Sequence, residues 1–242
     1  MPDPVRFDIV TSSRKALFYF LAKCNEYYRS GHDLTHYREI IARHRKATGL
    51  AELIDDPAFL RLLYETLELW NMNQKGARLT TLDRFRASLR EHKDELRELY
   101  PYKLLTLQFT DFQTITPLLE SVFCGLEGMK SRRRIVGVSK ALHFLLPDLV
   151  MPIDGKFTLP GFYGCNVYQK TALAEFQEQY RDILFRSYQA VRRLNLTEAD
   201  IDGKGWNTTA PKLIGNALIG LYKYFDHYTA EEFNELLLQL QD

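Results

Sequence analysis

Residues 129–163 read MKSRRRIVGVSKALHFLLPDLVMPIDGKFTLPGFY, and the expected fold is organised around this stretch. Its character changes along its length, from basic, through a glycine-containing turn and an apolar segment, to a single carboxylate. Five Lys or Arg and no acid occur between Lys130 and Lys140, although the whole chain carries 32 basic and 31 acidic residues. This local excess of positive charge predicts a surface that faces phosphate.

Gly137 and Asp154 mark the two ends of the structured part of this stretch. Glycine adopts positive φ without steric penalty, so we expect the backbone to turn sharply at Gly137 into a helix that begins near Ser139. Backbone N–H groups at a helix start attract anions, which suits the basic residues before it. Beyond the apolar segment, Pro152 precedes Asp154 and Gly155 follows it. The pattern predicts an anion-binding turn, a short helix and a carboxylate in an apolar turn.

The composition is that of an ordinary globular protein. The chain has 242 residues, of which 45% are hydrophobic, so it can bury a sizeable core. No apolar run approaches the roughly 20 residues that span a bilayer, and Met1–Pro4 lacks the basic and apolar regions of a signal peptide. Cys24, Cys124 and Cys165 form no CxxC pair, which argues against a disulfide framework and against a zinc or iron–sulfur site. We therefore expect a cytoplasmic protein with no metal and no other cofactor.

Apolar residues recur at helical spacing through most of the chain, and no stretch alternates apolar and polar residues for long enough to require a strand. The predicted fold class is therefore all-α. Proline, glycine and capping residues set the expected helix bounds, whereas 155–166 lacks periodicity and is expected to be a loop. The expected helices lie at about 12–31, 33–49, 57–70, 81–99 and 109–128, from about 139, at 171–194, from about 210, and from Thr229, where Glu232 completes a capping box.

Two short segments of the chain resemble the signature of a known enzyme family. Val136–Lys140, followed by Met151–Asp154, is similar to the Gly-Val-Gly and Pro-Val-Asp motifs of the helix-hairpin-helix DNA glycosylases. The similarity covers roughly residues 118–157. It implies that the hairpin amides hold a DNA phosphate, and that the Asp after the second helix assists cleavage of the N-glycosidic bond of a flipped-out base.

The predicted organisation is a single globular unit, residues 1–242, made of two helical lobes with a cleft between them. The lobe that contains the helix-hairpin-helix motif is expected at about 73–150, and the terminal helices at about 1–72 and 165–242 form the other. Asp154 is expected in the cleft as the catalytic carboxylate. An Asp in a Pro-Ile-Asp-Gly turn also serves as a helix cap or turn former, so that interpretation stays open.

The resemblance assigns DNA contacts to the basic hairpin and to a polar loop. Ordinary surface solvation is the alternative for the arginines. In the loop Asn71–Arg78, Asn73 or Gln74 is the predicted wedge that fills the gap left by the flipped base, and a connector capped by Asn is the alternative. The predicted DNA-binding residues are Arg132, Arg133, Arg134, Gly137, Val138, Ser139, Asn73 and Gln74.

Aromatic side chains in or beside the loops are candidates for the walls of a base pocket. They are Trp70, Phe162, Tyr163 and Trp206, and packing in the core is the alternative for each. His143 lies within the apolar segment, and we expect it to be a core histidine whose hydrogen bonds are satisfied.

Lys140 has two alternative roles, which depend on how the hairpin aligns with the family. If Lys140 matches the family's lysine, it is a catalytic amine that forms a Schiff base with the sugar and cleaves the strand. If Gly137 matches the first family glycine, Ala141 takes the lysine position and Lys140 contacts phosphate instead. The expected turn geometry favours the second alignment, and with it base removal without strand cleavage.

The predicted function is that of a monofunctional DNA glycosylase, which hydrolyses the N-glycosidic bond of a modified or damaged base and leaves an abasic site. The expected partner is double-stranded DNA, bound by a monomer with no membrane involved and, in a bacterium, at the nucleoid. A hypermodified base of phage DNA, removed in antiviral defence rather than DNA repair, is one hypothesis for the substrate. The alternatives are a non-catalytic helix-hairpin-helix module that clamps phosphate and a helical protein-interaction domain.

Overall fold

The computed structural model describes residues 6–28, 31–74, 77–130, 134–165, 169–225 and 229–240. These residues form helices and no strand, so the predicted all-α class is confirmed for them. An isolated antiparallel bridge joins Leu79 to Met129. In chain order the elements are α1 (Arg6–Val10), α2 (Arg14–Tyr27), α3 (His32–Lys46), α4 (Leu50–Asp55), α5 (Pro57–Leu69), α6 (Leu82–Glu91), α7 (Lys93–Leu99), η1 (Phe109–Asp111), α8 (Phe112–Gly125), α9 (Ile135–Leu145), α10 (Thr158–Tyr163), α11 (Ala172–Glu175), η2 (Phe176–Tyr180), α12 (Arg181–Arg193), η3 (Glu198–Asp200), α13 (Ala210–Phe225) and α14 (Ala230–Gln239).

Short polar side chains begin several helices where the sequence predicts a start. Asp56 accepts a hydrogen bond from Ala58 N at the start of α5, and Thr229 forms the expected capping box at α14. Such caps satisfy amides that have no partner within the helix. Two expectations are wrong, because α9 begins four residues before Ser139 and the expected loop at 155–166 contains α10.

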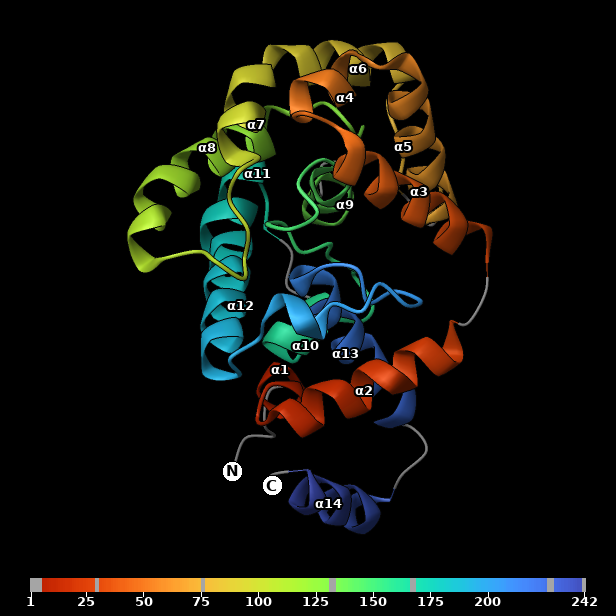
Figure 1. Cartoon of the computed structure of the whole chain (residues 1–242), viewed down its shortest axis with the longest axis vertical. Helices are drawn as coiled ribbons and strands as arrows, with labels where there is room; N and C mark the ends of the chain where they lie inside the picture. The colour runs from red at the N-terminus through yellow and green to blue at the C-terminus, as the bar shows by residue number, and fades with distance from the viewer. Residues whose placement is uncertain are drawn as a thin grey trace.

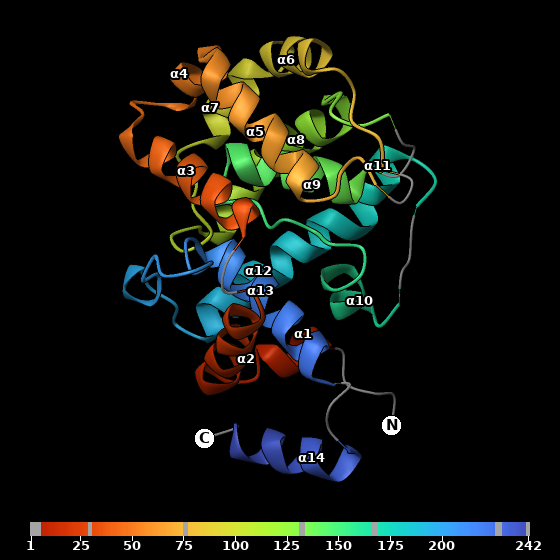
Figure 2. The same cartoon turned by 90° about the vertical axis from the view of Figure 1, so that its right-hand side faces the viewer.

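The helices form an upper and a lower group in the views of Figures 1 and 2. Figures 1 and 2 both show α9 among α3, α5 and α8, and show α1, α2, α10 and α13 together below them. α11, η2 and α12 follow one another directly along the chain. α11 and η2 pack against α8 in the upper group, and α12 contacts α13 in the lower group, so these three elements extend from one group of helices to the other. α3, α4 and α5 contact helices that follow residue 73, namely α6, α7 and α9. A division of the chain near residue 73 stays a prediction.

α9 lies in the core, and nearly all of its side chains are buried. His143 is fully buried, with its Nε2 2.9 Å from the Tyr37 hydroxyl and its Nδ1 2.7 Å from the Val150 carbonyl oxygen. The prediction of a satisfied core histidine is confirmed. Among the described helices, none is long and apolar enough to span a membrane.

The pair α2 and α13 makes the most extensive contact between helices, and a glycine permits it. A Cβ atom at Gly220 on α13 would lie 1.8 Å from the backbone oxygen of Phe20 on α2. No side chain fits at that distance, and backbone cannot move aside as a flexible side chain does. The sequence therefore brings these helices together at a position where only glycine is accommodated.

We expect Gly220→Ala to lower the free energy of unfolding by about 1 to 3 kcal/mol or more, because the added methyl group forces the two helices apart. Gly215→Ala on the same helix is the matched control. Its Cβ would find its nearest neighbour, Met151 Cγ, at an ordinary 3.8 Å, so the better helix propensity of alanine should leave stability unchanged or raise it by up to about 1 kcal/mol. Urea unfolding followed by circular dichroism measures both, and equal stabilities would contradict the packing.

Candidate active site

A cavity of about 200 Å³ opens between the end of α5, the middle of α9, the turn before α10 and the first half of α13. A single water needs only about 10 to 15 Å³, so the cavity can admit a much larger group. Its lining combines charged and aromatic side chains, which is the composition of a ligand site rather than of a packing defect. The residues that carry this chemistry are Lys140, Lys212, Asp154, Asp33, Trp70 and Trp206.

Lys140 and Asp154 meet in this cavity. Lys140 is only 6% exposed, and its Nζ lies 3.7 Å from Asp154 Oδ2 and donates to the backbone oxygen of Trp70 at 3.2 Å. Trp70 closes the C-terminal end of α5, where carbonyl oxygens lack helical partners and attract cations. The buried ammonium group is therefore held by one carboxylate and one helix end.

The two oxygens of Asp154 have different partners. Oδ1 accepts from Lys156 N at 2.7 Å and from Phe157 N at 3.2 Å, and so organises the turn that leads into α10. Oδ2 faces Lys140. The turn-former interpretation is thus correct for one oxygen, and the other oxygen lies in the cavity, where it can stabilise positive charge.

Burial lowers the pKa of both lysines of the cavity. It lowers the pKa of Lys140, although the adjacent Asp154 carboxylate opposes this shift. Burial also lowers the pKa of Lys212 to about 8, and the charge of Lys140 contributes to this lowering. Desolvation of an ammonium group increases the fraction of neutral amine, which is the nucleophilic form.

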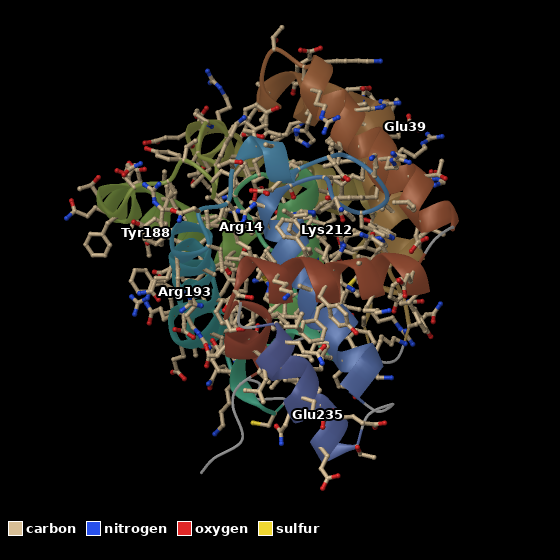
Figure 3. The ribbon with its side chains drawn as sticks, turned by 60° about the horizontal axis from the view of Figure 1, so that its bottom comes forward. Arg14, Glu39, Tyr188, Arg193, Lys212 and Glu235 are labelled. Atoms are coloured by element: carbon tan, nitrogen blue, oxygen red, sulfur yellow. The ribbon has the colours of Figure 1, made fainter. Side chains whose placement is uncertain are left out.

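Three aromatic rings surround Lys212. Its Nζ lies 4.5 Å from the centre of the Trp70 ring, 4.7 Å from that of Trp206 and 5.4 Å from that of Tyr37. Trp206 is fixed in turn by donation from its Nε1 to the backbone oxygen of Tyr28 at 3.1 Å. Figure 3 shows Lys212 near the middle of the molecule, whereas Glu39 and Glu235 lie at its periphery. Cation–π attraction stabilises the ammonium group in this setting.

Lys212 and Asn216 are not among the site residues predicted above, although the sequence contains a pattern that indicates them. They are the charged and amide side chains in the otherwise apolar run from Ala210 to Leu221. Their spacing of four residues places them on one face of a helix. A polar pair on one face of a buried helix predicts a cavity, and both residues line this one.

Of the four predicted base-pocket aromatics, Trp70 and Trp206 line the cavity. Phe162 does not, because it belongs to α10 and stacks on Phe7 with ring centres 4.4 Å apart in the core. Tyr163 does not line it either, since its hydroxyl lies 3.0 Å from both Gln179 O and Asp182 Oδ2. Neither side chain lines this cavity, for the same reason: the segment expected to be a loop contains a helix that packs on α1.

The predicted turn at Gly137 is also wrong. Gly137 lies in the first turn of α9, and it is not among the described residues with positive φ. A Cβ there would lie 2.4 Å from Met129 Cγ, so the glycine serves close packing. Val138 and Ser139 are fully buried, and Ser139 Oγ accepts from Ile153 N at 2.9 Å. Ser139 therefore helps to hold the segment that leads to Asp154, and both side chains lie in the interior of the protein.

Arg134 has partners inside the protein. Its guanidinium group donates to the backbone oxygens of Cys124 and Leu126 at the end of α8. The backbone amides of Arg134 and Ile135 donate to Oε2 of the buried Glu175 at 2.8 and 3.0 Å. A carboxylate of the protein therefore occupies the helix start at which a phosphate was expected. Arg132 and Arg133 lie outside the described residues.

In the polar loop, Asn73 stabilises the connection and does not face the cavity. Its Oδ1 accepts from Leu79 N at 2.9 Å, and its Nδ2 donates to Glu68 at 3.0 Å. The alternative of a connector stabilised by Asn is therefore correct for Asn73. Gln74 is exposed, and its role as a wedge stays a prediction. Asn71, with φ of 63°, is the loop residue that lines the cavity.

Comparison of the chain with protein-family models, with curated proteins and with solved structures finds no match.

The depressed pKa of Lys212 predicts a pH dependence of stability. Between about pH 8 and pH 10.5 the unfolded chain holds a proton that the folded protein has released, so raising the pH favours the folded state. The free energy of unfolding of the wild type, minus that of Lys212→Met, should rise by roughly 1 kcal/mol per pH unit over this range and be flat below it. Urea unfolding at several pH values measures this difference. The exposed Lys204→Met is the control and should parallel the wild type; a flat difference for Lys212→Met would contradict the assignment.

Proposed function

We propose that this protein is a DNA glycosylase that acts on a base flipped into the cavity, with Lys140 and Asp154 as its catalytic residues. The observation that carries the proposal is the approach of the buried Lys140 Nζ to within 3.7 Å of Asp154 Oδ2, in a cavity walled by two tryptophans. The resemblance of Val136–Lys140 and Met151–Asp154 to the helix-hairpin-helix glycosylases supports the same assignment.

The proposed chemistry follows from these two groups. As the bond between base and deoxyribose breaks, positive charge develops on the sugar, and a nearby carboxylate stabilises it. Asp154 Oδ2 supplies the negative charge that stabilises the sugar. The neutral amine of Lys140 attacks the anomeric carbon as the base departs and is protonated, so that nitrogen and the ring oxygen are both bonded to this carbon. Loss of a proton from nitrogen, cleavage of the C1′–O4′ bond and protonation of the ring oxygen then open the sugar and leave a Schiff base. Elimination from that Schiff base cleaves the strand.

This proposal reverses the preference between the two alignments of the hairpin. The alignment that implies a monofunctional enzyme requires Gly137 as a turn glycine and Lys140 as a phosphate contact. Gly137 instead lies within α9, and Lys140 is buried beside Asp154. Both placements favour the alignment in which Lys140 is the amine nucleophile, so we propose lyase activity together with base removal.

The walls of the cavity suit a flipped base. Extrusion of a base from the duplex costs a few kcal/mol, and stacking on an aromatic side chain contributes about 1 to 3 kcal/mol per base. Trp70 and Trp206 both line the cavity, with ring centres 6.2 Å apart. A non-catalytic phosphate clamp or a protein-interaction domain needs neither these walls nor a buried lysine beside a carboxylate.

The finer features of the fold belong to the same proposal. We propose that α8 and α9 are the two helices of the helix-hairpin-helix motif, and that the two groups of helices are lobes with the cavity in a cleft between them. Double-stranded DNA is the proposed partner, with Arg132 and Arg133 as phosphate contacts. Removal of a modified base for repair or for defence against phage DNA then depends on which base the cavity accepts.

Asp154→Asn should lower the rate of base excision by about 10² to 10³, because one well-placed electrostatic group contributes about 3 to 4 kcal/mol. The fold should survive, since Asn retains the oxygen that accepts from Lys156 N and Phe157 N. Lys140→Met should abolish strand cleavage. Single-turnover assays on duplexes that carry different modified bases, scored with and without alkali, measure both effects.

Lys93→Met is the control for the loss of a lysine, because Lys93 pairs with Asp55 and does not line the cavity. It should excise bases at the wild-type rate. Wild-type excision by Asp154→Asn would remove the carboxylate from the mechanism, and no excision of any base by the wild-type protein would remove the proposed function.

A further inference from the structure

Two buried side chains of α13 that carry hydrogen-bond donors line the cavity. Lys212 is 7% exposed and Asn216 is 2% exposed, and both line the cavity. Within the part of the chain that the structure describes, Asn216 Nδ2 has no partner, and Lys212 Nζ is surrounded by rings that accept no conventional hydrogen bond. Burial of an unpaired donor is unfavourable, so such a pair on a cavity wall indicates that a ligand supplies the acceptors.

We infer that Lys212 and Asn216 read one edge of the base and select a base that presents carbonyl oxygens there, against a base that presents amino groups or a positive charge. This inference rests on the proposed function and specifies the substrate class of the same site. An ammonium group has only donors. A carbonyl oxygen accepts a hydrogen bond from the ammonium group. An amino group offers no acceptor to it, and a cation is repelled by its charge.

The aromatic walls do not favour a cationic base. Tryptophan faces attract cations, and an empty aromatic cage would predict an alkylated, positively charged base. Here Lys212 Nζ already lies 4.5 Å and 4.7 Å from the two tryptophan ring centres. A second positive charge in the same cavity would meet the repulsion of Lys212 in a low-dielectric setting, where such repulsion is strong.

Both carboxylates of the cavity accept backbone hydrogen bonds, and Asp154 also faces Lys140. Asp154 Oδ1 accepts from two backbone amides, and its Oδ2 faces Lys140. Asp33 Oδ1 accepts from Leu34 N at 2.9 Å in the first turn of α3. Lys212 and Asn216 are buried donors on the wall of this cavity, and a site built from buried donors discriminates strongly against an analogue that lacks the acceptor.

The two tryptophans of the chain provide the readout, because both line the cavity. Intrinsic fluorescence therefore reports binding of free bases without any need for catalysis. The probes are hypoxanthine against adenine and uracil against cytosine, since each pair differs by a carbonyl group in place of an amino group. We expect the wild type to bind the carbonyl member at least about tenfold more tightly in each pair.

Lys212→Met should reduce the preference to within about twofold, because the donor is lost while the apolar length is kept. Asn216→Asp, which replaces a donor by acceptors, should weaken it as well, and it serves as the second variant if the Met variant does not fold. Lys223→Met is the control: this lysine lies on the same helix outside the cavity lining, and the wild-type preference should persist.

Equal affinity of the wild type for carbonyl and amino bases, no binding of any base, or a preference that survives in Lys212→Met would overturn the inference. These outcomes are distinct from failure of the proposed function. Excision from DNA without a preference for carbonyl bases would overturn the inference alone, and a clear preference for free carbonyl bases without excision from DNA would overturn the glycosylase alone.

Discussion

A lysine ammonium group inside a helical core must be compensated, and the way in which Lys140 is compensated determines the arrangement of the site. Isolated buried charge is strongly unfavourable. Lys140 projects from α9, the most buried helix around the cavity, and its Nζ is met by Asp154 and by the terminal carbonyl of α5. One ionised group thereby links α9, α5 and the turn before α10. Those three elements bound the cavity on the side where the chemistry is proposed.

The second lysine is stabilised differently, and the contrast suggests different roles. Lys140 has a carboxylate and a carbonyl oxygen as partners, whereas Lys212 has the faces of three aromatic rings. Ring faces reduce the cost of burying the charge but leave the N–H groups available. In the proposed mechanism Lys140 reacts beside a carboxylate, and Lys212 donates to the group that enters the cavity.

The sequence predicts those parts of the structure that depend on neighbouring residues, such as the cap of α5 at Asp56 and the capping box at Thr229. The sequence does not predict the features that depend on contacts with residues distant along the chain. Gly137 faces Met129 rather than a turn, and Arg134 and the start of α9 engage the end of α8 and Glu175. Basic residues near a glycine look alike in sequence whether they face phosphate or a helix end.

In the site, Asp154, Trp70 and Trp206 could be predicted because unusual residues in apolar or glycine-rich turns stand out. The aromatic surroundings of Lys212 could not be predicted from the sequence. Tyr37, Trp70 and Trp206 are distant from one another along the chain, and only the fold brings them together around Lys212 Nζ.

Borohydride trapping tests most directly whether Lys140 is the amine that reacts at the sugar. The substrates are duplexes that contain a cleavable base or an abasic site. Reduction converts a Schiff base into a stable bond, and mass spectrometry of the digested adduct identifies the residue. We expect an adduct on the peptide that contains Lys140, and none at that peptide in Lys140→Met. Base release without an adduct, or an adduct at Lys212, would contradict it.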